Sequence, residues 1–461
     1  MILHAGTGRL VPLAGVLVIA LLATQAPFVE VGPATHKIQH VIIVMQENRT
    51  FDNYFWTYPG QVGYKPSLCM PYDPNLSSPC LKPAEATSTV SVDLPHDWQS
   101  THVALNNGKM NGFLEAAGQS NEYNSKRAHD VMSYYDNSTL PNLWAYAKQY
   151  VLADRFFSSA KSYSQPNHWY MIAGNSPAVS LTEGEAQEKA ACYNSTTAQL
   201  TMGTCSYINE AQDISTMADV LTQHGVSWKY YDTPVPPGYT LAQAIAGNTG
   251  GPDAFAYWNP LFAKNSTYQS YENSVVAREQ FFWDLGNGTL PQVSWVIPSP
   301  GISDHPPANV TLGMWWITDI VDSVMKSKYW DNSMIVVMWD DYGGFFDTVT
   351  PPTVDGAGLS FRVPALIISP YAKKGYLDHT VLDFESTLKF IEWDFGLPSL
   401  THRDALANNL LGAFNFNQQP RKPYIIPLSG SQLNTIAPYI RQGAPGAKAM
   451  PALQFIGNDP D

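Results

Sequence analysis

Short blocks of apolar, β-branched residues alternate along this chain with stretches in which apolar positions recur at helical spacing. The blocks predicted as buried strands are residues 40–45, 150–156, 226–231, 293–297, 334–339 and 363–368. The stretches predicted as helices are residues 143–148, 216–224, 275–285, 314–326 and 384–395. This alternation is typical of βαβ units and predicts an α/β fold, with a mostly parallel central sheet sandwiched between helices.

Two of the predicted strands end abruptly in oxygen-bearing side chains. Asp340 and Asp341 follow one strand and precede a Gly-Gly turn, whereas Glu47 and Asn48 follow the first strand of the chain. Because the carboxyl ends of parallel strands meet at one edge of a sheet, we expect these side chains to form one composite site. Carboxylate and amide oxygens are ligands for a hard divalent cation. Either acid pair alone is equally consistent with a helix or turn cap, but two pairs favour a metal.

A serine is predicted at a strand-to-helix corner between these two segments. Ser164 precedes Gln-Pro-Asn, where the proline fixes a turn and a helical apolar pattern follows. Its hydroxyl would then lie at the carboxyl edge of the sheet, near a helix N-terminus that favours anions. Coordination to a metal can activate such a hydroxyl as a nucleophile without a histidine base. The competing interpretation is that Ser164 is only an N-cap, the commoner role of such a serine.

Three histidines in polar segments are candidates for contacts with an anionic substrate. His96, His102 and His305 each lie among Ser, Thr, Asp or Pro. A histidine in such a segment can protonate a leaving oxygen or hold a phosphoryl oxygen, although a single loop histidine usually does neither. Their significance depends on the neighbouring groups, because a phosphoryl transition state needs cations, donors and an acid around one phosphorus.

Composition narrows the class of protein. The 461 residues are 44% hydrophobic, which is ample for one large core. With a net charge of −13 and only 26 Lys plus Arg, the chain has little basis for a nucleic-acid footprint. Charged residues make up only 14% of the chain, against about a quarter in an average protein. A surface wetted mainly by amides and hydroxyls suits a secreted or cell-surface setting.

The N-terminus carries an apolar run at residues 10–26, after a short leader that contains Arg9. Its length fits a signal peptide cleaved after Ala26 better than a membrane span, and the alternative is a retained N-terminal anchor that contacts the membrane. Residues 27–461 are predicted to form a single catalytic domain with long loops and an irregular tail from Gln418 onward.

Cysteine usage agrees with export. Cys69 and Cys80 lie in one long loop, and Cys192 and Cys205 in another. Four cysteines permit three pairings, of which the local one is favoured by the short separations, and neither pair has the spacing of a metal knuckle. Asn-x-Ser/Thr sequons, predicted as glycosylation sites in an exported chain, stand at Asn75, Asn137, Asn194, Asn265, Asn287 and Asn309.

Several ordered motifs give the chain a family resemblance. They are residues 47–52 (ENRTFD), 164–167 (SQPN), 304–307 (DHPP), 340–347 (DDYGGFFD) and 362–365 (RVPA). Over about residues 37–416 the chain resembles the phosphoesterase family, which includes bacterial and plant phospholipases C and bacterial acid phosphatases. The resemblance implies the fold of the alkaline phosphatase superfamily, a mostly parallel sheet between helical layers.

The resemblance also implies roles for individual residues. The expected metal ligands are Glu47, Asn48, Ser164, Asp340 and Asp341, which hold one divalent ion of unspecified identity. The expected catalytic groups are Ser164 as the nucleophile, together with Asn48, His96 and His305. Substrate binding is assigned to His102, Asn167, His168 and Tyr342.

The chain departs from the family pattern around the expected pocket. Tyr342 stands where many relatives have histidine in Asp-Glu-His-Gly-Gly, and Thr348 replaces the histidine of Asp-His-Val. His168 stands where Pro-Asn-Arg is common. The metal ligands and the nucleophile are unaffected by these changes, so the reaction is predicted more firmly than the substrate.

The prediction is an exported, metal-dependent phosphate-ester hydrolase that forms a phosphoserine intermediate. The charge of −13 opposes docking on anionic membranes, so an acid-phosphatase-like phosphomonoesterase is favoured over a phospholipase C. The phospholipase alternative remains for zwitterionic lipids, with aromatic residues 230–231 and 315–316 either lining a choline or acyl subsite or belonging to the core. A sulfatase is less favoured, because this sequence shows no Cys or Ser motif ending in Arg of the kind that sulfatases use. A catalytically inactive cell-surface glycoprotein would have no reason to retain the whole constellation.

Overall fold

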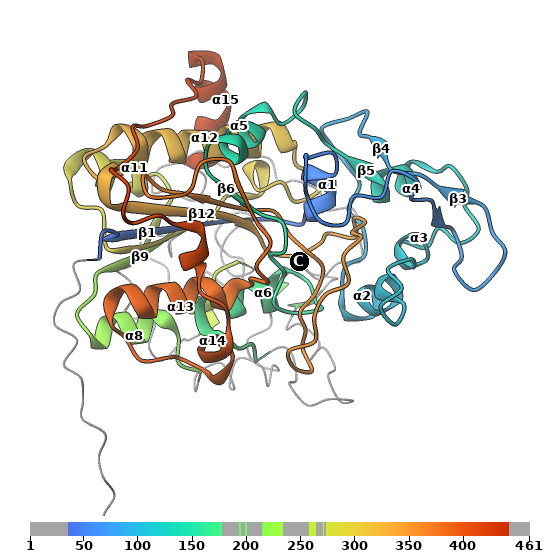
Figure 1. Ribbon diagram of the computed structural model, residues 1–461, viewed down its shortest axis with the longest axis horizontal. Helices are drawn as coiled ribbons and strands as arrows, with labels where there is room; N and C mark the ends of the chain where they lie inside the picture. The colour runs from blue at the N-terminus through green and yellow to red at the C-terminus, as the bar shows by residue number, and fades with distance from the viewer. Residues whose placement is uncertain are drawn as a thin grey trace, which may run out of the picture. The chain divides into compact units, whose positions relative to one another are not determined.

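The computed structural model describes residues 36–177, 193–194, 199–200, 214–233, 258–263, 271 and 273–441 (Figure 1). The predicted signal peptide and the pair Cys192 and Cys205 lie outside the described residues. The described residues from Lys37 to Arg441 belong to one compact unit. No helix in the described part is both long and apolar enough to cross a membrane.

A central sheet of eight strands runs through this unit in the order β10-β9-β11-β1-β12-β13-β6-β14. Its strands are β1 (His40–Gln46), β6 (Val151–Ala153), β9 (Trp228–Asp232), β10 (Val275–Ala277), β11 (Val293–Val296), β12 (Ser333–Trp339), β13 (Ala365–Ile368) and β14 (Tyr376–Asp378). β13 is antiparallel to both its neighbours, and every other pairing in this sheet is parallel. The predicted mostly parallel sheet is therefore confirmed.

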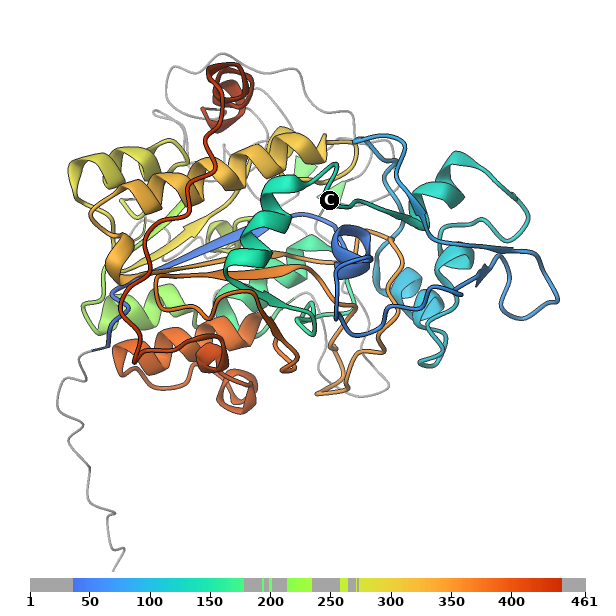
Figure 2. The ribbon, with the colours of Figure 1, turned by 45° about the horizontal axis from the view of Figure 1, so that its top comes forward.

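Two layers of helices enclose the sheet (Figures 1 and 2). One layer holds α5 (Pro141–Gln149), α11 (Gln280–Asn287), α12 (Val310–Lys326) and α15 (Gly430–Ile440), and the other holds α6 (Ser164–Ala173), α8 (Met217–Gln223), α13 (Phe384–Phe395) and α14 (His402–Leu406). Because both faces are covered, strands β1 and β12 carry continuous apolar runs rather than an alternating pattern, and all of β12 is buried.

A smaller lobe lies beyond the carboxyl ends of β1 and β12 (Figure 1). It contains α2 (Trp98–Leu105), α3 (Phe113–Ala116), α4 (Lys126–Val131), β2 (Met70–Pro71), β3 (Cys80–Leu81), β4 (Ala84–Glu85) and β5 (Ser133–Tyr134). Helix α1 (Phe51–Phe55) packs its apolar side chains into the main core. The predicted disulfide between Cys69 and Cys80 is present at the β2–β3 hairpin. Phe345 and Phe346, from the segment after β12, pack in the lobe's own hydrophobic cluster and so join the lobe to that end of the sheet.

Short elements complete the described chain. They are the antiparallel pair β7 (Tyr193–Asn194) and β8 (Gln199–Leu200), and the 3₁₀ turns η1 (Pro260–Ala263), η2 (Pro300–Ile302), η3 (Trp330–Asn332) and η4 (Leu410–Ala413).

The predicted helix over residues 275–285 is wrong at its start. Val275–Ala277 form β10, which pairs in parallel with β9, and helix α11 begins only at Gln280. An apolar run this short fits either a strand or a helix, and the neighbouring strand decides which forms.

The pairing of β1 with β12 is the part of the fold that builds the site. The two strands run in parallel, and their register extends from His40 opposite Ser333 to Gln46 opposite Trp339. The residues that directly follow the two strands, Glu47 after β1 and Asp340 after β12, therefore lie at the same edge of the sheet. This confirms that the ends of two distant strands converge.

Candidate active site and metal centre

The strand ends converge through a direct hydrogen bond. Glu47, Asn48, Asp340 and Asp341 are all fully buried. Asn48 adopts a left-handed backbone conformation, with φ of 57°, and its backbone N–H donates to Asp340 Oδ1 at 2.8 Å. Asparagine tolerates this region better than most residues do, which explains its place at the turn after β1.

The Gly-Gly turn after β12 allows the close approach of β1. Gly343 has φ of +55°, and a Cβ built there would lie 2.3 Å from the carbonyl oxygen of Asn48. Its backbone N–H donates to Asp341 Oδ1 at 2.8 Å and so orients that carboxylate. A side chain at position 343 would push the two strand ends apart.

Helix α6 presents two polar side chains to these strand ends. Ser164 and His168 are four residues apart and so share one face of the helix. Ser164 Oγ lies 3.2 Å from Asn48 Oδ1 and 3.5 Å from Asp341 Oδ2. The N-cap of α6 is Tyr163, and no side chain caps the helix there. The hydroxyl of Ser164 therefore faces the site instead of capping its helix.

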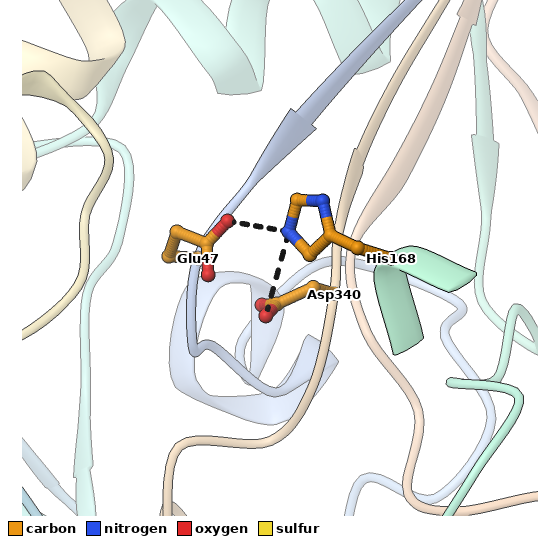
Figure 3. A group of neighbouring side chains, drawn as sticks. All are labelled: Glu47, His168 and Asp340. Atoms are coloured by element: carbon orange, nitrogen blue, oxygen red, sulfur yellow. Dashed lines mark hydrogen bonds and ion pairs between the residues drawn. The ribbon is translucent and has the colours of Figure 1, made fainter. Parts of the chain in front are cut away.

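His168 reaches the other half of the acidic group (Figure 3). Its Nε2 lies 2.8 Å from Glu47 Oε1 and 4.0 Å from Asp340 Oδ2. Figure 3 shows the three side chains converging from helix α6 and from the ends of the two strands. The sequence assigned His168 to substrate binding, whereas the structure places it directly against two expected metal ligands.

Asn167 has a structural position beneath the site. Its Nδ2 donates to the carbonyls of Ser162 and Tyr163 at 2.9 and 3.0 Å, and its Oδ1 accepts from the N–H of Ala160 at 2.9 Å. These bonds fix the loop that delivers Ser164. The expected contact of Asn167 with substrate gains no support, because both ends of its side-chain amide already form hydrogen bonds with the backbone of the preceding loop.

Two of the predicted histidines flank the site. His96 Nε2 lies 3.1 Å from Asn48 Nδ2 and 3.8 Å from Asp341 Oδ2, while its Nδ1 lies 2.6 Å from the carbonyl of Leu94. We infer the tautomer protonated on Nδ1, with Nε2 accepting from Asn48. His305 is also oriented through Nδ1, which lies 2.7 Å from the carbonyl of Pro306. The two imidazole rings lie 6.3 Å apart.

Among the described residues His102 has no contact with this cluster, whereas Tyr342 meets it through the ring of His96. His102 is exposed on α2, where its Nδ1 bonds the carbonyl of Trp98 at 2.7 Å and its ring packs on Trp98. Tyr342 is buried behind His96, with ring centroids 6.3 Å apart, and packs on Phe361. Burial raises the pKa of Tyr342, so the phenol stays neutral. Their predicted substrate contacts are therefore unsupported.

Trp258 is a site residue that the sequence analysis missed. Its indole stacks on His168, with centroids 6.4 Å apart and planes 14° apart, and it lies 6.2 Å from the ring of His305. The indole N–H is buried without a hydrogen-bond partner among the described residues. No local pattern could have revealed this role, because Trp258 lies far from His168 in the sequence and approaches it only in the folded chain.

Asp304 is a second residue to which the sequence gave no role. It connects the segments that carry the site residues through hydrogen bonds. Its carbonyl accepts from Arg49 Nη2 at 2.6 Å, and its Oδ2 accepts from Trp339 Nε1 at 3.0 Å. Burial raises the pKa of this carboxyl to about 7, although Arg49 opposes the shift. Asp304 thus links the end of β12 to the loop that carries His305.

The donor set fits a divalent cation. Ligand atoms of Glu47, His168 and Asp340 lie within 4.8 Å of one another, and all three residues are buried. Oδ2 of Asp340 has no hydrogen-bond partner in the described part of the chain. Buried carboxylates this close together require a compensating positive charge. All five predicted ligands are brought together, with His168 beside them.

Comparison with known proteins gives consistent matches. The model of a family described as "Phosphoesterase family" matches residues 38–398. Non-hemolytic phospholipase C of Burkholderia pseudomallei is 26% identical over 82% of this chain and 59% of its own length. Phospholipase C B of Mycobacterium tuberculosis is 27% identical over 89% of this chain and 83% of its own. Non-specific phospholipase C1 of Arabidopsis thaliana is 25% identical, covering 87% and 76%.

The chain thus spans less than two thirds of the Burkholderia protein but most of the mycobacterial one. A solved structure of a protein in the alkaline phosphatase superfamily from Vibrio parahaemolyticus aligns with a TM-score of 0.38 and 14% identity, over 87% of this chain and 73% of that one.

Proposed function

This chain belongs to the phosphoesterase family and is a hydrolase of phosphoric ester bonds, and from that premise we propose that it is an exported phospholipase C. It would cleave the bond between glycerol and phosphate in a zwitterionic phospholipid. The observation that carries the proposal is the hydroxyl of Ser164, held 3.2 Å from Asn48 and 3.5 Å from Asp341 where the strand ends meet.

The substrate preference differs from the one that charge alone favoured. A net charge of −13 argued for a phosphomonoesterase, but relatives that match most of this chain are phospholipases C. The negative charge of the protein opposes binding to anionic membranes, but it does not oppose binding to a zwitterionic lipid, which has no net charge. The aromatic pairs considered for a choline subsite give no support, because Tyr230, Tyr231 and Trp316 are fully buried in the core. Trp258, beside His168 and His305, is the aromatic group available to a headgroup.

The residues present would hold a divalent cation through Glu47, Asn48, Asp340 and Asp341. When bound, it would lower the pKa of the serine hydroxyl and offset the charge of the phosphoryl oxygens. Asn48 presents its amide at the same point and can stabilise an equatorial oxygen.

Ser164 then acts as the nucleophile. Its hydroxyl releases its proton to solvent and Oγ forms a bond to phosphorus. The bond between phosphorus and the glycerol oxygen breaks, and that oxygen takes up a proton from a neighbouring histidine. His305 is the better proton donor of the two flanking histidines, because His96 Nε2 already accepts from Asn48. Water then attacks the phosphoserine, releases the phosphorylated headgroup and returns the hydroxyl.

Export is supported by two features. The apolar run at residues 10–26 has the pattern of a signal peptide. The disulfide between Cys69 and Cys80 suits an oxidising compartment.

Replacement of Ser164 tests the mechanism. We expect Ser164→Ala to lower phospholipid turnover at least about 1000-fold, because the covalent route is lost, and to leave the fold intact. Turnover of phosphatidylcholine in mixed micelles, with thermal unfolding measured on the same preparation, checks this. Ser138→Ala, an exposed serine of the smaller lobe, is the matched control. Full activity in Ser164→Ala would refute the assignment.

Comparing substrates tests the proposed specificity. The wild-type protein should hydrolyse phosphatidylcholine faster than a soluble aryl phosphate monoester, and chelator should abolish both activities. The opposite order would support the phosphomonoesterase alternative. Absence of both activities in a metal-loaded, folded protein would support the inactive glycoprotein.

A further inference from the structure

The imidazole of His168 lies among the acidic side chains at the strand ends. Its side chain is fully buried, and its Nε2 lies 2.8 Å from Glu47 Oε1 and 4.0 Å from Asp340 Oδ2. The sequence led us to expect an all-oxygen metal site. In the folded chain, an imidazole nitrogen lies among those oxygens instead (Figure 3).

The helical position of His168 and one neighbouring ring set the direction of this imidazole. Because His168 is one helical turn after Ser164 on α6, both side chains point to the same edge of the sheet. The indole of Trp258 stacks on the ring within 14° of parallel. A ring held this way has little freedom to turn Nε2 away from Glu47 and Asp340, and such preorganisation is what a metal ligand requires.

The residue type matters as much as its position. In the motif that this chain resembles, arginine is common at position 168, and a guanidinium has no acceptor atom with which to ligate a metal. A neutral imidazole offers a lone pair. Imidazole suits zinc, iron and other transition ions, whereas calcium and magnesium take oxygen ligands almost exclusively.

We propose that His168 Nε2 is a direct ligand of the cation, and that this nitrogen makes the site select a transition ion such as Zn²⁺ over Ca²⁺ and Mg²⁺. The inference rests on the proposed function only in requiring that a cation occupies the site. The competing arrangement is that Nε2–H donates to Glu47 and merely orients that carboxylate.

Metal binding by His168→Gln separates the two arrangements. The full chain would be stripped with chelator and titrated with Zn²⁺, Mn²⁺ and Ca²⁺ by calorimetry. Wild type should bind Zn²⁺ at least about 100-fold more tightly than Ca²⁺. His168→Gln should weaken Zn²⁺ at least about 30-fold and change Ca²⁺ less than about threefold, because only zinc gains much from nitrogen. His129→Gln, the same change at an exposed histidine of α4, should change neither affinity.

Pulsed electron paramagnetic resonance of the Mn²⁺-loaded protein gives a readout independent of activity. Wild type and His129→Gln should show nitrogen modulation, and His168→Gln should not. Labelling histidine with ¹⁵N in wild type should alter the modulation, which tests for an imidazole ligand even if the variant fails to fold.

Three results would overturn the proposal. Absence of histidine modulation in the Mn²⁺-loaded wild type would exclude a nitrogen ligand. An equal loss of Zn²⁺ and Ca²⁺ affinity in a folded His168→Gln would mean that His168 only positions Glu47. If wild type bound none of these ions, the metal-dependent function itself would fail, a result distinct from the other two.

Discussion

At the scale of single residues, the geometry of the site depends on Gly343, which has no side chain, as well as on the polar side chains that line it. Gly343 lets the turn after β12 lie against Asn48, and its N–H bonds Asp341 at 2.8 Å. We expect Gly343→Ala to lower turnover and metal affinity about 100-fold, because a Cβ in contact with the Asn48 carbonyl would move the ligands by roughly 1 Å. Steady-state kinetics and metal titration measure both effects.

Gly118 provides the control for this substitution. It also has a positive φ, +71°, but a Cβ there meets nothing within 4 Å. Gly118→Ala should therefore cost only about 1 kcal/mol of stability through backbone strain and leave turnover unchanged. If both variants lost activity equally, backbone conformation rather than close approach would explain the result.

At the scale of elements, a buried arginine joins α1 to the segment after β12. Arg362 Nη2 lies 2.6 Å from Asp347 and 2.8 Å from Asp52, and all three residues are fully buried. Arg362→Met should lower the free energy of unfolding by about 3–5 kcal/mol, because two carboxylates would remain buried without their partner. Urea unfolding measures this. Arg127→Met on α4 is the control, and equal stability of the two variants would contradict the prediction.

The junction of α13 and α14 should make stability depend on pH. Glu392 and Asp404 both accept from the N–H of Leu400, at 3.0 and 2.8 Å. Burial, followed by the bond to Asp404, raises the pKa of Glu392 to about 8. The folded state thus holds a proton that the unfolded chain releases above its usual pKa near 4.5, so stability falls as the pH rises from about 4.5 to 8.

Replacing this carboxyl with an amide tests the origin of the effect. Glu392→Gln mimics the protonated form, since its amide can donate to Asp404 and accept from Leu400. We expect the variant to be roughly 2 kcal/mol more stable than wild type at pH 8.5 and similar at pH 5. Unfolding in urea at both values measures this, with exposed Glu85→Gln as the control. A wild-type slope retained in Glu392→Gln would assign the pH dependence to other groups.

At the scale of the whole molecule, the cation should contribute to folding as well as to catalysis. The sheet, α6 and the lobe meet around buried carboxylates that repel one another without a compensating charge. Removing the metal with chelator should lower stability by about 3–4 kcal/mol relative to protein at 100–1000 times the dissociation constant. Calorimetric scans with and without added metal measure the shift. An unchanged unfolding temperature, with activity lost, would mean that the metal serves chemistry alone.

Local patterns in the sequence predicted the strand-end oxygens, six of the eight strands of the central sheet, and helices α5, α8, α12 and α13. β-Branched runs ending in Glu47-Asn48 and Asp340-Asp341 follow short-range rules, and so does the corner before Ser164. The α/β class could be predicted for the same reason. The short strand β10 could not, since its three residues become a strand only by pairing with β9.

Tertiary structure alone decided which side chains share the site. The register of β1 on β12 brings Glu47 beside Asp340, and the packing of α6 aims His168 at both. Trp258 reaches His168 across 90 residues of chain, while His102, equally plausible in sequence, faces outward from α2. Sequence thus determined which side chains are chemically suited to bind a metal or a phosphate, because that depends on residue type. Their proximity depends on contacts between distant segments, which no local pattern encodes.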